Sequence, residues 1–424
     1  MNRSKLITGI LSLLFLPPLL HAQVSKHAIP IPIEGIDTTQ RKDTSVCTKF
    51  ETNCNKQLDL IDIGLMAIKK EKTKRIDTGE IKSTKLRISA IPAAGYTLQT
   101  GFAGIITANA AFYANKEANI SSILTSIAYS ERNQIILPLQ ANFWTKDNKY
   151  NIVLDWRYLY YPTYTYGLGM NTLLSDGYLI NYSALRLHQM VLRKIAYDMY
   201  AGLGYNLDYF WSIREVNPPA GVKTDFEKYG LTPTELASGL TFTYLYDTRK
   251  NSINPETGNY LNVVYRPNLA FLGNNATWRS LIIDARKYLK LFPNSDNVLA
   301  FWNYDWLTVS GTPPYLMLPN TGSDPYSNTG RGYIQGRFRG KNMLYLESEY
   351  RFGITHNGLL GGVVFANAES FSEQTTNKFD KIAPGYGLGI RVKLNKFSKT
   401  NVALDYGFGT GGSGGFFVNL GEVF

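Results

Sequence analysis

One stretch of the sequence, residues 330–354 (GRGYIQGRFRGKNMLYLESEYRFGI), joins arginines and carboxylates that could pair with one another. Its first half is basic and broken by glycines, whereas its second half alternates and contains Glu347, Glu349 and Arg351. The chemistry open to such a set is ion pairing, because a planar guanidinium makes bidentate, charge-assisted hydrogen bonds to a carboxylate. A long loop needs a bond of this kind, since ordering it costs conformational entropy. We therefore interpret Arg331 as the residue that pins its loop; the alternative is a solvated loop arginine.

The histidines and cysteines do not indicate covalent chemistry. Beyond residue 22 the histidines are His27, His188 and His356, which are isolated in the sequence, and a hydrolase would need one of them beside a nucleophile or an acid pair. His188 could be paired with Ser183, but a histidine in a lumen or at an interface is the simpler interpretation. No group of histidines and cysteines has metal-ligand spacing, and no glycine run precedes a helix as a phosphate-binding loop would. We expect no enzymatic activity, no metal and no cofactor.

The stretch that carries the glutamates has the pattern of a strand with two different faces. Alternate residues of a strand point to opposite sides, so Glu347, Glu349 and Arg351 share one side with Tyr345, while Leu346 lies on the other. Carboxylates in a row are costly against lipid. The charged row is therefore predicted to face water or protein.

Composition favours a transmembrane β-barrel over a soluble enzyme. The chain contains 29 Tyr, 21 Phe and 37 Gly, and beyond its N-terminus no apolar run approaches the length of a membrane-spanning helix. Aromatic rings suit both membrane interfaces, and a closed sheet leaves no backbone group unpaired in lipid. The net charge of +11 is scattered over the chain rather than gathered in a patch. We therefore expect contact with outer-membrane lipids and no nucleic-acid partner.

The N-terminal region divides into a leader and an extension. Basic residues precede an apolar run and then small residues, the order of a secretory signal peptide cleaved near Ala22-Gln23. Residues 1–22 are thus predicted to be a signal peptide and residues 23–85 a mostly irregular periplasmic extension, with a short helix near 57–70. Two cysteines in the extension are equally compatible with a disulfide and with free thiols: Cys47 and Cys54.

From residue 86 to residue 424 the sequence alternates with a period of two, most clearly in 150–160. Such runs predict about sixteen strands, an even number as bacterial barrels prefer. The longest gaps fall in one set of alternate connections, which we assign to the extracellular side, and short gaps fall in the periplasmic set. The long gaps are 161–181, 213–234 and 310–341, and the short ones are 146–149, 193–195 and 292–295.

Several motifs occur in a characteristic order through residues 86–424. They are Ile91-Pro92 with Gly95-Tyr96 and Thr100-Gly101; Tyr246-Asp247-Thr248-Arg249 with Asn254-Pro255 and Gly258; Arg331-Gly332-Tyr333 upstream of Glu349-Tyr350-Arg351-Phe352; 385–391; and 403–407. On these motifs the chain resembles the BamA/TamA superfamily of outer-membrane insertases and translocases, the bacterial surface antigen barrels. The resemblance implies an all-β fold, a sixteen-stranded antiparallel transmembrane β-barrel whose sixth extracellular loop enters the lumen with an Arg-Gly-aromatic tip.

The resemblance also implies an acceptor for the loop arginine. In the family this is typically an aspartate in a Phe-x-Asp-x-Gly strand motif, but here residues 365–369 read Phe-Ala-Asn-Ala-Glu. Asn367 therefore stands at the place of the aspartate, and Glu369 at that of the glycine. Three substitute acceptors are considered for Arg331: Glu369, Glu349 and Asp405.

The C-terminal stretch is the other marked feature. Glycines at 407–415 crowd its hairpin and remove side-chain contacts, which either weakens the pairing or simply suits a tight turn. In insertases the seam between first and last strands opens laterally. Four apolar residues, interrupted by Glu422, share one face of the alternating pattern and resemble the signal by which outer-membrane barrels are recognised: Phe416, Val418, Leu420 and Phe424.

We expect the chain to assist the insertion, assembly or translocation of outer-membrane or secreted proteins through this seam, in the outer membrane of a Gram-negative bacterium. The family usually places periplasmic POTRA modules ahead of the barrel, and residues 23–85 do not convincingly form one. The expected partners are therefore client proteins and the periplasmic or lipoprotein subunits that deliver them. The alternative is a passive pore or a structural subunit of an envelope complex, and a hydrolase using His188 is a third hypothesis.

Overall fold

In the computed structural model, the described part of the chain comprises residues 57–69, 84, 86–115, 117–249, 251–274, 276–292, 295, 297–396 and 399–424. The predicted signal peptide, most of the predicted extension and both cysteines, Cys47 and Cys54, lie outside these residues. Helix α2 (Leu60–Lys69) forms within the stretch predicted to be helical. Among the described residues, no helix has both the length and the apolar character needed to cross a membrane.

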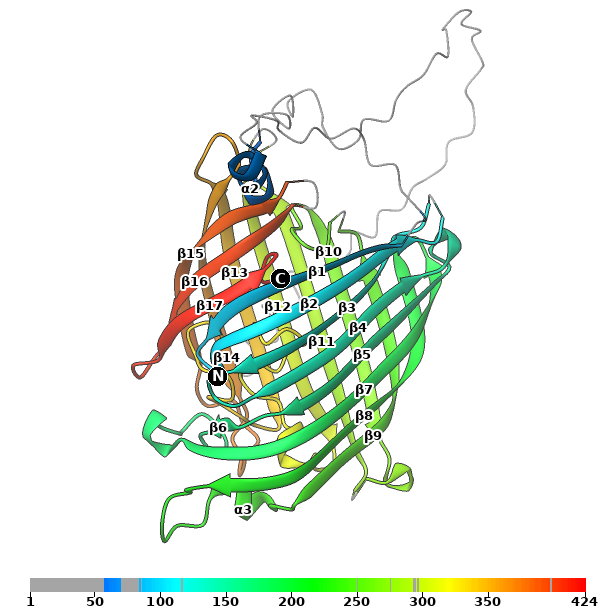
Figure 1. Cartoon of the computed structure of the whole chain (residues 1–424). Coiled ribbons are helices and arrows are strands. Elements are labelled where there is room, and N and C mark those ends of the chain that lie inside the picture. The colour runs from blue at the N-terminus through cyan, green and yellow to red at the C-terminus, as the bar shows by residue number, and fades with distance from the viewer. Residues whose placement is uncertain are drawn as a thin grey trace, which may run out of the picture. The chain divides into compact units, whose positions relative to one another are not determined.

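The rest is mainly antiparallel sheet in which the strands pair in chain order (Figure 1). The strands are β1 (Arg87–Thr97), β2 (Gly101–Tyr113), β3 (Ile120–Ser130), β4 (Ile135–Trp144), β5 (Tyr150–Tyr160), β6 (Thr163–Thr165), β7 (Tyr178–Ala196), β8 (Met199–Val216), β9 (Thr234–Asp247), β10 (Gly258–Asn268), β11 (Trp278–Lys290), β12 (Val298–Ser310), β13 (Asn342–Gly353), β14 (Leu360–Phe371), β15 (Ala383–Asn395), β16 (Thr400–Phe408) and β17 (Gly414–Leu420).

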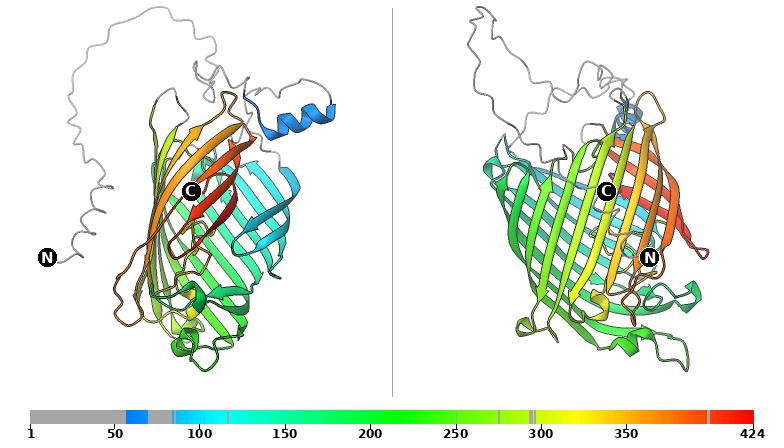
Figure 2. Two further views of the ribbon diagram at one scale, coloured as in Figure 1. Left: turned by 90° about the vertical axis from the view of Figure 1, so that its left-hand side faces the viewer. Right: turned by 180° about the vertical axis from the view of Figure 1, so that it is seen from behind.

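The sheet curls into a barrel, which Figure 2 shows from two further sides. Of its seventeen strands, β6 has only three residues and lies beside β7 in a long connection. The other sixteen form the wall, which confirms the predicted number. Their aromatic and β-branched residues suit the pleated surface of a sheet.

The two ends of the barrel differ in the length of their connections. Long ones follow β5, β8 and β12 and contain short helices such as α3 (Asp225–Tyr229), so we call this the loop end and the opposite one the turn end. The predicted short turn at 193–195 is wrong, because β7 continues to Ala196 and the chain reverses at Tyr197-Asp198. Asp198 has a φ of 55°, a conformation that aspartate tolerates better than most residues.

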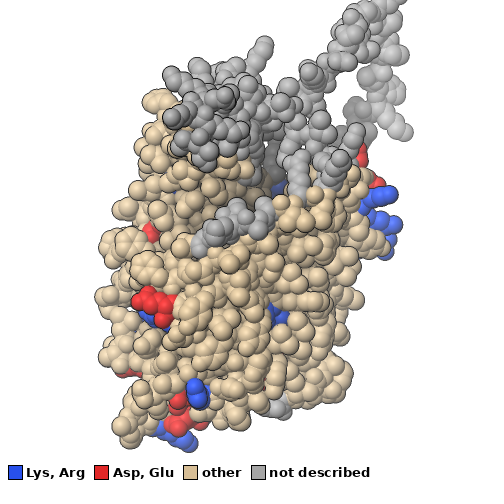
Figure 3. All heavy atoms as spheres, in the orientation of Figure 1, with Lys and Arg blue, Asp and Glu red and all other residues tan. Residues whose placement is uncertain are grey.

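The wall has a polar or aromatic inner face and an apolar outer face. On β13, Tyr345, Glu347, Glu349 and Arg351 are buried, whereas Leu346 is 50% exposed, as the alternation predicts. Buried aromatic side chains from several strands and from the β12–β13 connection pack together inside the barrel. On the face shown in Figure 3, most of the surface between the two ends is uncharged, apart from a small group of charged side chains. Such a surface suits the apolar interior of a membrane.

One junction of the wall differs from the others. Neighbouring wall strands are joined by hydrogen-bonded registers from β1 to β17, but within the described residues no register joins β17 to β1. β17 has 7 residues and β1 has 11, so β17 is too short to cover its neighbour. Near the loop end, Leu98 packs against Gly415, where an added Cβ would meet the leucine side chain. We call the β1–β17 junction the seam.

Candidate functional site

The connection between β12 and β13 folds back into the lumen and is the sixth at the loop end, as predicted. Its backbone is bonded to itself, because the Thr321 N–H donates to the Phe338 carbonyl at 3.0 Å. The Asp324 carboxylate accepts from the backbone N–H groups of Asn328 and Thr329 at 2.7 and 2.6 Å. These bonds give the loop a shape of its own, so a few contacts with the wall can orient it.

Arg331 of this loop is fully buried. Its guanidinium donates to Glu347 and Glu349 on β13, and to Asp405 on β16 at 2.6 Å. The same group lies over the ring of Phe365 on β14, 3.7 Å from the ring centroid. One loop side chain therefore contacts three strands of the wall, and the burial is incompatible with a solvated loop arginine.

The three substitute acceptors differ in their contacts. Glu349 and Asp405 bond the guanidinium of Arg331. Glu369 instead accepts from the Thr321 hydroxyl at 3.0 Å, and the described contacts include no bond between it and Arg331. The interpretation of Glu369 as an acceptor for Arg331 is therefore wrong, because its carboxylate meets another residue of the loop.

Asn367 and Glu347 complete the surroundings of Arg331. The Asn367 side-chain amide donates to the Arg331 carbonyl oxygen at 2.9 Å, so it holds the backbone of the loop rather than the guanidinium. Sequence reasoning placed Glu347 in the inward row but not among the acceptors. The available signal was its position two residues from Glu349 on the same face of β13.

Gly332 and Tyr333 fit the loop tip against the wall. Gly332 has a φ of +113°, and an added Cβ would come within 2.7 Å of the Phe408 carbonyl oxygen. A side chain here would therefore be both strained and obstructed. The buried Tyr333 hydroxyl donates to the Pro384 carbonyl at 2.6 Å and accepts from the Thr410 N–H at 3.0 Å. The tip thus contacts the loop-end parts of β15 and β16.

Other arginines share the carboxylates around Arg331. The Arg351 Nε donates to Glu349 at 2.7 Å, and Arg391 donates to Asp405. A buried carboxylate without a cation is costly, so these partners explain how several acids can surround one arginine. The site is an ion-pair network that connects β13, β15 and β16 to the loop.

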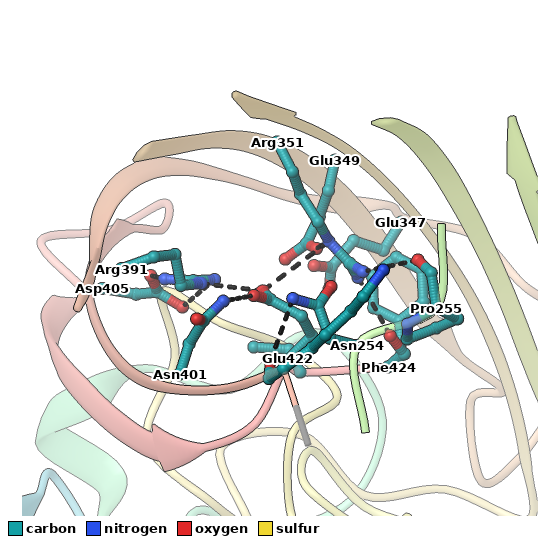
Figure 4. A network of polar contacts seen from close by, with 12 residues as sticks. Asn254, Pro255, Glu347, Glu349, Arg351, Arg391, Asn401, Asp405, Glu422 and Phe424 are labelled. Carbon is teal, nitrogen blue, oxygen red and sulfur yellow. Dashed lines mark hydrogen bonds and ion pairs between the residues drawn. The ribbon is translucent and has the colours of Figure 1, made fainter. Parts of the chain in front are cut away.

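The segment that follows β17 joins the same network (Figure 4). Gly421 has a φ of 94°, and the chain turns there toward the interior of the barrel. Glu422 accepts from Arg391 Nε at 2.7 Å and from the Asn401 amide at 2.6 Å. Burial acts to raise the pKa of Glu422, but the guanidiniums of Arg391 and Arg351 outweigh it and hold the pKa below its ordinary value. We call residues 421–424 the tail.

The tail breaks the shared face predicted for the C-terminal stretch. Phe416 and Leu420 are 56% and 66% exposed on β17, and Val418 is half-buried, whereas Phe424 is buried. The prediction is wrong for Phe424, because alternation between faces holds only within a strand and β17 ends at Leu420.

Phe424 instead packs inside the barrel near the turn end. Its ring stacks on Trp302 at a centroid distance of 5.2 Å. Arg351 donates to its carbonyl oxygen at 2.9 Å. The preceding carbonyl, of Val423, accepts from Asn328 of the loop at 2.8 Å. Loop and tail therefore bond to each other as well as to the wall.

His188 belongs to a separate cluster. Its Nε2 lies 2.8 Å from Asp208, and Arg186 and Arg266 bond the same carboxylate at 2.8 and 2.7 Å. Among the described contacts none joins His188 to Ser183. The cluster is a set of cross-strand ion pairs on the inner wall, without a base beside a nucleophile. In the part of the chain that the structure describes, no three His, Cys, Asp or Glu side chains are grouped to hold a metal ion.

Comparison of the sequence with models of protein families identifies the family of this chain. The model of the Omp85 superfamily domain matches residues 161–424, more than half of the chain. The chain belongs to the Omp85 superfamily. This finding confirms the family that the sequence motifs indicated. No curated protein matches the sequence.

Solved structures share the fold of this Omp85 barrel. "BamA from Haemophilus ducreyi lacking POTRA domains 1-3" aligns with a TM-score of 0.52 at 12% identity, covering 80% of this chain and 70% of that one. CdiB from Acinetobacter baumannii aligns with a TM-score of 0.50 at 12% identity, covering 80% of this chain and 60% of that one. CdiB from Escherichia coli aligns with a TM-score of 0.50 at 9% identity, covering 76% of this chain and 58% of that one. The Omp85 chain described here thus spans less than two thirds of the CdiB chains. At these identities the likeness concerns the fold.

Proposed function

We propose that this Omp85 barrel assists the insertion, assembly or translocation of outer-membrane or secreted proteins at its seam. The observation that carries the proposal is the state of β1, which is paired with β2 on one side and has no register with β17 among the described residues. An unpaired strand edge offers backbone donors and acceptors to an incoming strand. A client strand would pair with β1 there, without covalent chemistry.

The proposed setting is the outer membrane of a Gram-negative bacterium. The turn end would face the periplasm, where clients arrive, and the loop end would face the exterior. Residues 1–22 would be removed as a signal peptide, and residues 23–85 would form a periplasmic extension. Periplasmic or lipoprotein subunits would deliver the clients. BamA and CdiB, which share the fold, are themselves barrels of this architecture, and this likeness supports the assignment.

The loop and tail distinguish this proposal from a passive pore. Arg331 and Tyr333 of the loop are buried inside the barrel, so the loop occupies part of the lumen through which ions would pass. We expect the intact barrel to show almost no ion conductance in planar bilayers. Deletion of residues 320–338 should make it conduct. A high conductance of the intact chain would favour the alternative of a passive pore or structural subunit.

Photo-crosslinking tests the insertion proposal. A crosslinking amino acid at Ala94 of β1 or Phe416 of β17, both exposed, should give adducts with newly made outer-membrane proteins. Leu203 on β8 is the matched control, because it is 61% exposed on a strand that is paired on both sides. No client adduct at either seam position, under any depletion of assembly factors, would sink the proposal.

A further inference from the structure

Helix α2 (Leu60–Lys69) is attached to the turn end through polar residues. One oxygen of Asp59, the residue before the helix, accepts from the Asp62 N–H at 2.7 Å, as an N-cap does. Its other oxygen accepts from the Lys396 N–H at 2.9 Å, and the Asp62 carboxylate pairs with the Lys396 ammonium at 2.9 Å. Both aspartates are fully buried, and Lys396 lies in the turn that follows β15.

A second turn holds the start of the helix. The Leu58 N–H donates to the Asn357 carbonyl at 2.9 Å in the connection between β13 and β14. The Lys396 ammonium also donates to the Gln57 carbonyl at 3.3 Å. Two neighbouring turns therefore fix the position of α2, and every one of these contacts is polar.

Among the helix residues whose side chains the structure describes, the exposed ones are apolar. Leu60 and Ile63 are 38% and 40% exposed, although Asp59 and Asp62 are 0% exposed. Residues three positions apart lie on the same side of a helix, so the two apolar side chains form one surface. A helix on a water-soluble protein packs in the opposite way, with its apolar side inward. The arrangement of α2 therefore suits an apolar medium outside it.

The surroundings of α2 identify this medium. Ile354 begins one of the turns that hold the helix and is 55% exposed, and Leu388 and Ile390 on the outer face of β15 are 58% and 50% exposed. These residues belong to the apolar outer face of the wall. In the sequence, residues 70–75 (KEKTKR) follow the helix with four basic residues and one acidic residue. Basic residues that follow an apolar helix in the sequence are typical of segments that bind anionic lipid headgroups.

We propose that α2 is an interfacial helix whose Leu60–Ile63 surface enters the headgroup boundary of the periplasmic leaflet. Its partner is a lipid surface that contains anionic phospholipid. The polar contacts with the two turns hold the helix at the turn end of the barrel. The apolar surface of the helix then attaches the turn end to the leaflet. The assignment to the periplasmic leaflet rests on the orientation given under the proposed function.

Quenching by lipid tests the proposal on the full chain. Cys47 and Cys54 are replaced by serine, and a single cysteine at Ile63 carries a bimane fluorophore in vesicles of phosphatidylethanolamine and phosphatidylglycerol with brominated acyl chains. We expect quenching at Ile63 to lie between that of a label at Ile390 on the outer wall and that of a label in water. A label at Glu117, which is exposed in the β2–β3 turn, is the control and should stay unquenched. Quenching at Ile63 no greater than at Glu117 would overturn the proposal.

A second measurement separates lipid from a protein partner. In native outer membranes, shielding of the Ile63 label from aqueous iodide, combined with no quenching in vesicles, would show that a protein covers α2 and would overturn the proposal. Omitting phosphatidylglycerol should weaken the quenching at Ile63, and unchanged quenching would overturn the role of anionic lipid. Folded mobility on an unheated gel checks that each labelled barrel is intact. Both leaflets of the vesicle are alike and no client protein is present, so the result depends neither on the orientation of the barrel nor on client insertion.

Discussion

The two sides of the seam are held together by different kinds of bond. On the side of β17, Arg331 and Arg391 link β13, β15 and β16 through buried carboxylates, and the tail is bonded to the same groups. On the side of β1, the described residues of β1–β4 show no ion pair. Several hydrogen bonds there join neutral side chains, as between Gln99 and Thr163 at 2.6 Å or Ser130 and Gln134 at 3.1 Å, and the Glu131 carboxylate accepts from the Phe102 backbone N–H at 3.1 Å.

If the seam opens as proposed, this difference predicts which side of it would move. A neutral hydrogen bond contributes only about 1 kcal/mol to stability, whereas breaking a buried ion pair by removing one partner costs roughly 3–5 kcal/mol. We therefore infer that β1–β4 yield when the seam opens, while β13–β17 remain fixed to the loop. The following substitutions test this comparison, from the largest expected effect to the smallest.

Arg331→Ala should have the largest effect. It would leave Glu347, Glu349 and Asp405 buried with fewer cations, and we expect the free energy of unfolding to fall by about 3–5 kcal/mol. Urea titration checks this, with the folded fraction read from the mobility of unheated samples on a gel. Arg193→Ala is the matched control, because Arg193 is exposed. If both variants unfold at the same urea concentration, the ion pairs of Arg331 do not stabilise the strands on the β17 side of the seam.

Phe424→Ala should have the next largest effect. It removes a buried ring that stacks on Trp302, and truncation of a buried phenylalanine costs about 3 kcal/mol. The end of β17 would then be held less firmly, so crosslinking of clients at Phe416 should rise. Leu420→Ala, on the exposed face of β17 directly before the tail, is the control and should change the free energy of unfolding by less than about 1 kcal/mol. Equal losses in the two variants would contradict an anchoring role of the tail.

Glu422 should make the free energy of unfolding depend on pH, because it bonds the tail after β17 to Arg391. Burial raises its pKa, but Arg391 and Arg351 hold the pKa below the ordinary value of 4.5. The stabilisation by charged Glu422 is therefore complete above this value and is lost as the pH falls through the lowered pKa. Glu422→Gln should cost roughly 1.5 kcal/mol at neutral pH and less in acid. Parallel stability curves of the two proteins down to pH 3 would refute this role.

Leu98→Ala tests the side of β1 and should have the smallest effect on stability. Leu98 is only half-buried where it packs against Gly415, so we expect a loss of less than about 1 kcal/mol. The same change should raise the yield of client adducts at Ala94, because one of the contacts across the seam is gone. Ile127→Ala on the outer face of β3 is the control and should leave that yield unchanged.

The wall was largely predictable, because alternation between faces depends on residues that are neighbours in the chain. β5 occupies Tyr150–Tyr160, the run that alternates most clearly, and the inward row of β13 was predicted residue by residue. The site was predictable only in part. Glu347 and Glu369 both point inward from adjacent strands, and the register pairs Glu347 with Asn367 but Glu369 with Tyr345. Which acid meets Arg331 therefore depends on how deeply the loop enters the lumen.

The sequence by itself determined the family, the barrel and the charge of the β13 inner face, since these follow from motif order and from a period of two. The tertiary structure decided the acceptors of Arg331 and the inward turn at Gly421. It also decided that α2 contacts the barrel through polar residues and exposes Leu60 and Ile63. These features depend on contacts between residues far apart in the chain. Strand register, loop depth and a single positive φ set those contacts, and no local pattern encodes them.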